Sequence, residues 1–75
     1  MKLQDRITFE PGKCGGRPCI RSMRIRVIDV LEMLARDMST DEVLEQFPDL
    51  ERDDVLACLD YAASRLGHPR IMVSA

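Results

Sequence analysis

Apolar side chains recur at helical spacing in the middle of the chain. Between positions 27 and 36 they stand at i, i+3, i+4, i+7 and i+8: Val27, Val30, Leu31, Leu34 and Ala35. This spacing places apolar side chains on one side of an amphipathic helix and polar ones on the other. We therefore predict a first helix over residues 27–36.

A second, shorter helix is indicated by a capping motif. Ser39 and Glu42 have the spacing at which each side chain bonds the backbone N–H of the other residue. Pro48 cannot continue a helix and disfavours helical geometry at the residue before it. The sequence therefore predicts a helix over residues 40–47.

A third helix is predicted over residues 52–66. Its expected inner face is an apolar stripe: Val55, Leu56, Leu59, Ala62, Ala63 and Leu66. Gly67 has the residue type most common just after a helix end, and Pro69 follows it closely. Residues 68–75 are expected to form a C-terminal tail.

The segment before the helices has the period of β structure. Residues 6–10 alternate polar and apolar side chains, which predicts a short strand that Pro11 ends. Residues 19–25 are expected to form a ribbon that turns around Arg21 and Ser22. Taken together, these elements predict a mainly α fold: a single domain over residues 1–67, with a three-helix, helix-turn-helix bundle behind a short N-terminal β segment.

Length and composition limit the core and suggest the compartment. The chain has 75 residues, no Trp, one Tyr and two Phe, so its core is thin, and pairing of free strand edges in a homodimer would help to stabilise it. No apolar run approaches the 18 or so residues of a membrane helix, and the first residues lack the apolar region of a signal peptide. Three cysteines, an odd number, favour reduced thiols. We expect a cytoplasmic protein without a membrane partner.

Charge is distributed unevenly along the chain. Residues 1–26 hold seven basic side chains against two acidic ones, a net charge of +5, whereas residues 27–66 hold eleven acidic against three basic ones, a net charge of −8. Five cations without an intervening acid form a candidate nucleic-acid surface: Lys13, Arg17, Arg21, Arg24 and Arg26. They would attract phosphates. The alternative is that charge only protects an edge strand from aggregation.

The third predicted helix is acidic on its polar side. Three aspartates there would be repelled by phosphate, which argues against placing this helix deep in a major groove of DNA. A protein partner is the better fit for its polar residues: Asp53, Asp54, Asp60 and Tyr61.

Catalytic and metal chemistry find little support in the sequence. No nucleophile is paired with a base, so we expect no enzyme and no cofactor. A zinc site built from Cys14, Cys19, Cys58 and His68 would have the wrong ligand spacing, and buried thiols are the simpler interpretation. Residues 12–16 lack the glycine–lysine order and the following helix of a phosphate-binding loop.

The sequence resembles the domain-of-unknown-function family 433 over about residues 6–66. The resemblance lies in the run from Cys14 to Arg21, in residues 24–27, 30–31 and 38–44, in Phe47-Pro48-Asp49-Leu50, and in residues 57–63. It implies a homeodomain-like helix-turn-helix fold and the role of an antitoxin that neutralises a PIN-like nuclease toxin encoded by an adjacent gene. Such a protein would also repress its own operon by binding operator DNA. The alternative is a stand-alone helix-turn-helix transcriptional regulator.

This sequence departs from the family pattern at two places. Ser22-Met23-Arg24 stands where the family has Gly-Thr-Arg, and Glu51 stands where a Thr usually caps the third helix. These departures fall on the turn of the ribbon and on the start of the third helix.

Overall fold

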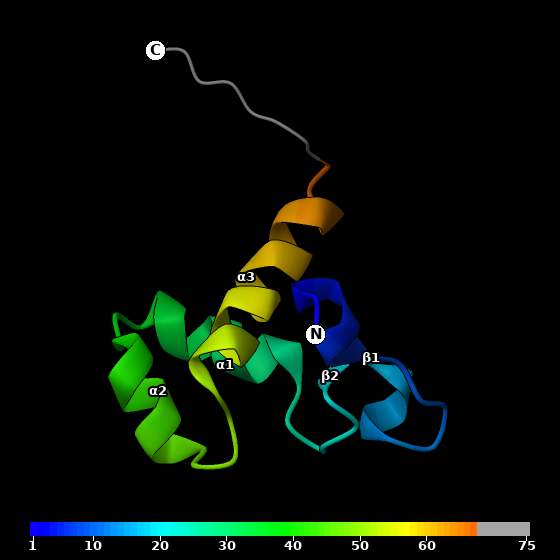
Figure 1. Ribbon diagram of the computed structural model, residues 1–75, viewed down its shortest axis with the longest axis horizontal. Helices are drawn as coiled ribbons and strands as arrows, with labels where there is room; N and C mark the ends of the chain where they lie inside the picture. The colour runs from blue at the N-terminus through cyan, green and yellow to red at the C-terminus, as the bar shows by residue number, and fades with distance from the viewer. Residues whose placement is uncertain (68–75) are drawn as a thin grey trace.

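The computed structural model describes residues 1–67 and has three helices behind a two-stranded antiparallel sheet (Figure 1). In chain order the elements are the 3-10 turn η1 (Leu3–Arg6), β1 (Ile7–Thr8), the turn η2 (Cys14–Gly16), β2 (Cys19–Ile20), α1 (Val27–Ala35), α2 (Thr40–Gln46) and α3 (Arg52–Arg65). The predicted mainly α fold with a short N-terminal β segment is confirmed. The tail predicted at residues 68–75 lies outside the described residues.

The two strands are shorter than the sequence predicts. Within the sheet Ile7 pairs with Ile20 and Thr8 with Cys19, and Cys19 forms a further isolated antiparallel bridge with Arg26. The turn that follows begins at once, because Arg21 has a φ of 45° and the next residue a φ of 62°, and this left-handed geometry ends the extended run. The strand predicted over residues 6–10 is therefore reduced to two paired residues, whereas the ribbon predicted over residues 19–25 turns at Arg21 and Ser22 as expected, with an antiparallel bridge between Cys19 and Arg26. After β2 the chain folds back on itself in a hairpin turn over residues 20–25. The backbone N–H of Ile20 donates a hydrogen bond to the Ile25 carbonyl at 3.0 Å and closes this turn.

The three helices lie within one residue of their predicted ends. The Ser39 hydroxyl accepts from Glu42 N at 3.1 Å, and the Glu42 carboxylate accepts from Ser39 N at 2.7 Å. This is the reciprocal capping that the sequence predicts for the start of α2. Gly67 follows α3 with a φ of 96°, the left-handed conformation that glycine adopts without strain.

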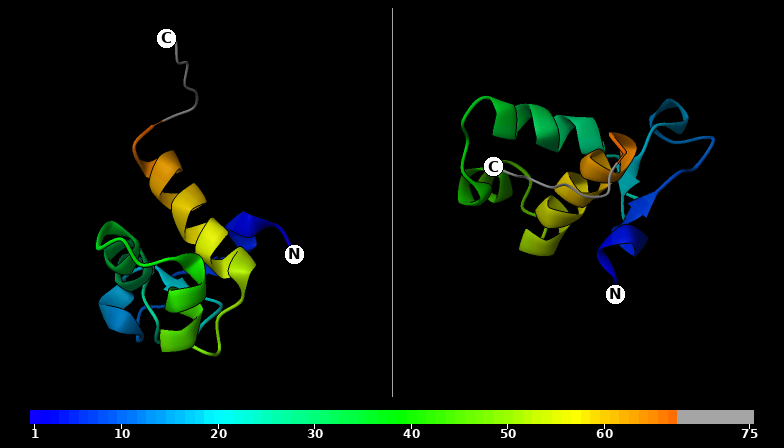
Figure 2. Two further views of the ribbon diagram at one scale, coloured as in Figure 1. Left: turned by 90° about the vertical axis from the view of Figure 1, so that its left-hand side faces the viewer. Right: turned by 90° about the horizontal axis from the view of Figure 1, so that it is seen from above.

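The core is small and aliphatic, and both strands and all three helices contribute to it. Its buried members are Ile7, Cys19, Ile20, Val27, Val30, Val43, Leu50, Val55, Ala57 and Cys58. The helix α3 packs against η1, β1, α1 and α2, so it is the element around which the others gather (Figure 2). Among residues 1–67 no helix has the length and apolar character needed to cross a lipid bilayer.

The predicted inner face of α3 is correct at Val55, which is buried, but wrong at its leucines. Leu56 and Leu59 are each 46% exposed and Leu66 is 90% exposed. Besides Val55, the buried side of α3 consists of Asp54, Ala57 and Cys58. The helix is turned so that a carboxylate, rather than its leucines, faces the N-terminal segment, and the contacts of that carboxylate explain why.

Candidate functional site: a buried ion network and the outer face of the third helix

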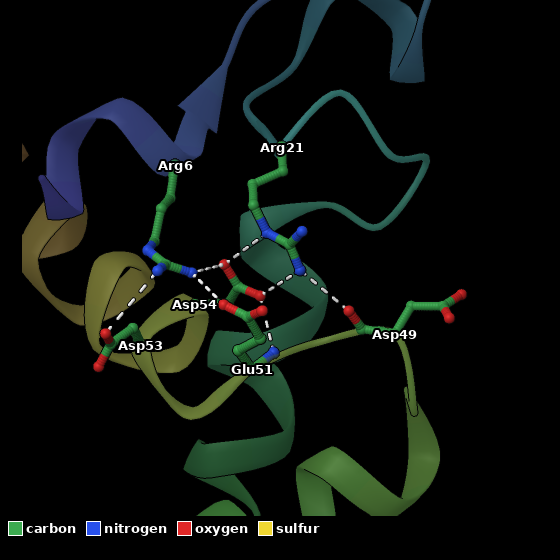
Figure 3. A network of polar contacts seen from close by, with 6 residues as sticks. All are labelled: Arg6, Arg21, Asp49, Glu51, Asp53 and Asp54. Carbon is green, nitrogen blue, oxygen red and sulfur yellow. Dashed lines mark hydrogen bonds and ion pairs between the residues drawn. The ribbon is translucent and has the colours of Figure 1, made fainter. Parts of the chain in front are cut away.

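A buried carboxylate in the first turn of α3 holds the N-terminal half of the protein in place. The side chain of Asp54 is fully buried and accepts four hydrogen bonds (Figure 3). Arg21 donates two of them in bidentate fashion, from Nε to Oδ1 at 3.0 Å and from Nη2 to Oδ2 at 2.8 Å. Arg6 donates a third from Nη1 to Oδ1 at 2.9 Å, and the backbone N–H of Glu51 a fourth to Oδ2 at 2.7 Å.

The two arginines extend this network to neighbouring groups. Arg6 Nη1 also bonds the Glu51 carboxylate at 2.8 Å, and its Nη2 lies 3.7 Å from Asp53 Oδ2. Arg21 Nη2 donates to the carbonyl oxygen of Asp49 at 2.9 Å. The buried carboxylate of Asp54 is tolerated because both of its oxygens accept hydrogen bonds, whereas removal of one member of the network leaves an uncompensated charge inside the protein. The network therefore fixes η1, the hairpin turn and the start of α3 relative to one another.

The protonation equilibrium of Asp54 reflects these contacts. Burial acts to raise the pKa of Asp54, but the hydrogen bonds from Arg21, from the Glu51 backbone and from Arg6 outweigh it. The pKa of Asp54 is consequently held below its ordinary value. Asp54 also raises the pKa of Arg21, because its carboxylate accepts two bonds from that guanidinium. The carboxylate of Asp54 is thus ionised at neutral pH.

The five predicted nucleic-acid-binding cations fall into two groups. Three of them have partners within the chain: Arg21 in the network, Arg26 with Asp29 at 2.7 Å, and Lys13 with the Ser22 carbonyl at 2.6 Å. The other two, Arg17 and Arg24, are exposed and have no ion pair among residues 1–67. The basic stretch is therefore partly neutralised by acidic residues of α1 and α3, through the pairs Arg26–Asp29 and Arg21–Asp54, and the two charged regions of the sequence are not separate surfaces.

The four predicted partner-binding residues are also divided by the structure. Asp54 has no exposed surface, so it cannot meet a partner, and its assignment as a contact residue is corrected here. Tyr61 is half-buried against Phe9, with ring centroids 5.9 Å apart. Only Asp53 and Asp60 are exposed, and their i, i+7 spacing places them on the same side of α3.

Sequence reasoning missed an apolar surface beside these two aspartates. Leu56, Leu59, Ala63 and Leu66 are all exposed and are spaced 3, 4 and 3 residues apart, the repeat that forms one continuous seam along a helix. We call these four residues the outer face of α3. Leu56 lies three residues after Asp53 and four before Asp60, so the acidic residues border the outer face. The spacing was visible in the sequence, but the same leucines were assigned to the core.

The positions of the cysteines and acidic side chains bear on whether the protein can hold a metal ion. Among residues 1–67, no group of three or more His, Cys, Asp or Glu side chains is arranged to hold a metal ion. Cys19 and Cys58 are buried and Cys14 is half-buried. His68, the remaining ligand of the zinc site weighed above, lies outside the described residues.

The fold and this site define a small tri-helical domain with a short β hairpin and an exposed apolar helix face. The model of a family described as a protein of unknown function (DUF433) matches residues 7–62, and the chain belongs to that family. The crystal structure of a DUF433 member from Anabaena variabilis ATCC 29413 is similar, with a TM-score of 0.78 and 31% sequence identity. The similarity covers 85% of this chain and 63% of the other, so this chain spans less than two thirds of that relative. The curated proteins gave no match.

Proposed function

We propose that this chain is an antitoxin-type binding module that neutralises a PIN-like nuclease encoded by an adjacent gene. The observation that carries the proposal is the outer face of α3, with Leu56 and Leu59 each 46% exposed between Asp53 and Asp60. Exposed leucines that form one continuous patch mark an interaction surface, whereas leucines scattered singly over a surface do not. Membership of the DUF433 family is compatible with this role.

The chemistry of the outer face fits a partner with a positively charged rim around an apolar groove. The leucines would form the buried core of the interface. The aspartates at the edge of the interface would orient the partner by attracting its positive charges. A nuclease that binds RNA has a cationic surface of this kind around its active site. Binding there would block access of the substrate, which is how neutralisation would follow from contact alone.

The test is to measure binding of the purified chain to the PIN-like protein encoded beside its gene. Replacing Leu56 and Leu59 by Gln should weaken binding by about 100-fold or more, because two buried leucine contacts are lost. Ile28→Gln is the matched control, since Ile28 on α1 is 43% exposed yet lies off the outer face. Unchanged affinity in the double variant, or an equal loss in the control, would rule out this surface.

The charge contribution can be tested in the same assay. Asp60→Lys should slow association with a cationic partner, and the effect should shrink as salt is added. Glu45→Lys on α2 makes the same charge change at another exposed acidic position. An equal effect of both changes would mean that overall charge, rather than the border of the outer face, governs association.

We propose DNA binding for autoregulation as a second activity, and it rests on the two exposed arginines of the hairpin region. Arg17 and Arg24 are free of ion pairs within the described part of the chain, whereas Arg21 is engaged with Asp54. Replacing Arg17 and Arg24 by Ala should reduce the slope of log affinity against log salt by about 2 units if both contact phosphates. A stand-alone regulator would show this DNA binding without any partner nuclease, which distinguishes the alternative.

We also propose that the chain forms a homodimer. The exposed ring of Phe9 follows β1 directly and lies against Tyr61, so pairing near β1 would cover an aromatic surface away from the outer face of α3. Sedimentation velocity at micromolar concentration should detect the dimer, and Phe9→Ser should shift the equilibrium toward monomer. A folded monomer at all concentrations would contradict this proposal without affecting the partner surface.

A further inference from the structure

The outer face of α3 has the spacing of the contact seam of a coiled coil. When Leu56 is placed at position a of a seven-residue repeat labelled a to g, the four residues of the outer face occupy successive a and d positions, which meet the neighbouring helix in a coiled coil. Positions b, c and f, which a coiled coil leaves in water, are here buried or half-buried between residues 54 and 61: Asp54, Ala57, Cys58 and Tyr61. Within residues 1–67 the fold therefore covers the back of the repeat and leaves its contact seam exposed.

The two edges of this seam differ in charge and in access. Asp53 and Asp60 both stand at position e, seven residues apart, and both are exposed. Position g on the other edge is held by Val55, which is buried, and by Ala62, which is half-buried. Arg52, which precedes the seam, is already paired with an aspartate of α2. A helix lying on the outer face would thus meet negative charge along one edge and the body of the protein along the other.

The C-terminal half of α3 leaves space for another helix beside it. Figures 1 and 2 show this half extending beyond α1 and α2, and Leu66 at its end is 90% exposed. At a rise of about 1.5 Å per residue, the outer face is about 15 Å long from Leu56 to Leu66. A partner helix of about three turns would cover it.

We propose that the outer face of α3 binds an amphipathic helix of the partner, whose apolar side chains interlock with the seam and whose Lys or Arg side chains lie opposite Asp53 and Asp60. This inference rests on the proposed partner surface and specifies what the partner presents there. Such a helix would form one wall of the partner's positively rimmed groove. Apolar contacts along the seam would supply most of the affinity, and the row of paired charges would determine which helix is accepted.

A second copy of α3 fits this surface less well than a basic helix does. In an antiparallel pair the e positions of the two helices face each other, so aspartate would meet aspartate, and like charges opposed at an interface are costly. In a parallel pair each acidic edge would face position g of the other copy, where Val55 and Ala62 are covered by that copy's own fold. The distribution of charge and burial therefore favours a different, basic helix.

The test uses the full chain and two synthetic helical peptides. Both peptides have Leu at every a and d position over about three heptads, and one has Lys at every e and g position where the other has Glu. Like charges along both edges keep either peptide from pairing with itself. Fluorescence anisotropy of the labelled peptides, titrated with the chain, should show at least about 10-fold tighter binding of the Lys peptide at low salt. This difference should narrow as salt is added.

Two neighbouring substitutions locate the contact on the seam. Ala63→Leu enlarges the small side chain of the outer face and should tighten binding of the Lys peptide by about 10-fold, because it adds apolar contact area. Ser64→Leu is the matched control, since Ser64 is also exposed but stands at position b, off the seam, so its replacement should leave the affinity unchanged. Asp60→Lys should shift the preference toward the Glu peptide, because it reverses the charge at position e.

The outcomes separate the helix contact from the identity of the partner. Equal affinity for both peptides, equal effects of Ala63→Leu and Ser64→Leu, or equal binding of a peptide with a scrambled a/d order would overturn the inference. A dimer of the chain that Leu56→Gln disrupts would also overturn it, since a second copy would then occupy the seam. Selective binding of the Lys peptide without binding of the neighbouring nuclease would support the helix contact and refute only the proposed partner. Nuclease binding that depends on the leucines, without any peptide preference, would refute the helix contact alone.

Discussion

The two sides of α3 differ in a way opposite to the usual pattern of a surface helix. Its inner side begins with a fully buried carboxylate, Asp54, and its outer side carries leucines that are 46% to 90% exposed. Ordinary amphipathic packing would bury the leucines and leave the carboxylate in water. On the inner side the Asp54 carboxylate receives hydrogen bonds from Arg6 and Arg21 of the N-terminal segment. On the outer side the described part of the chain leaves the leucines exposed.

This difference shows that available partners, and not polarity alone, decide which side of a helix faces inward. A carboxylate that receives four hydrogen bonds is stable in the interior, and two of its donors come from residues 33 and 48 positions away. Rotating α3 to bury its leucines would leave both guanidinium groups without their acceptor. The inner side of α3 accordingly serves the fold, whereas the outer side, within residues 1–67, has no such network.

The largest expected effect comes from removing the buried carboxylate. Asp54→Ala should lower the free energy of unfolding by about 3–5 kcal/mol, because it leaves two guanidinium groups facing the interior and removes the bond to Glu51 N. Urea unfolding followed by circular dichroism measures the change. For a domain of this size, such a loss is a large fraction of the total stability.

Asp53→Ala is the matched control for that experiment. Asp53 is the neighbouring residue and has the same side chain, but it is exposed and lies 3.7 Å from Arg6. Its removal should cost well under about 1 kcal/mol, as for other exposed ion pairs. Similar losses for Asp53 and Asp54 would mean that the buried network is not what orients α3.

Lowering the pH should reduce the free energy of unfolding by an intermediate amount. The pKa of Asp54 is depressed in the folded protein, so its contribution to stability is present above the unfolded-state pKa of about 4 and is lost as the pH falls through the folded-state value. Below about pH 4, stability should fall by up to about 1.4 kcal/mol per pH unit from this group. Unfolding midpoints measured from pH 7 down to strong acid should show this slope in wild type and a shallower one in Asp54→Asn.

Asp29→Asn provides the comparison for the acid experiment. The hydrogen bond from Arg26 lowers the pKa of Asp29 as well, but this pair is only partly buried. In this variant the loss of stability per pH unit in acid should be reduced less than in Asp54→Asn. Parallel acid profiles for wild type and Asp54→Asn would show that other carboxylates, rather than the network, cause the acid sensitivity.

The helices could be predicted from the sequence because their signals are local. Capping at Ser39, the stop at Pro48 and the glycine after α3 each act within a few residues, and every helix end was predicted to within one residue. The strands were overestimated because alternation continues through Glu10, whereas pairing with β2 ends at Thr8 and Cys19. Pairing depends on a second segment, and a single strand pattern does not contain that information.

The candidate site was harder to predict because it depends on contacts between distant segments. The sequence identified Arg21 and Asp54 as surface residues with opposite charges, one for nucleic acid and one for a protein partner. The structure joins them at 2.8 Å across 33 positions, and Arg6 was not selected at all. Once that pairing is known, the rotation of α3 and the exposure of its leucines follow from it, but no local pattern specifies the pairing.

The smallest expected effect is on the outer face of α3. Replacing Leu56 and Leu59 by Gln should change the free energy of unfolding by no more than about 0.5 kcal/mol per residue, because both side chains already contact water and Gln is a good helix former. Val55→Ala is the contrasting control, since Val55 is the intervening buried residue and its truncation should cost about 2 kcal/mol. Urea unfolding of all three proteins measures this contrast, and the same double variant is the one expected to lose the partner. A double variant that loses as much stability as Val55→Ala would show that the leucines serve the fold, and a drop in binding could then no longer be ascribed to the outer face.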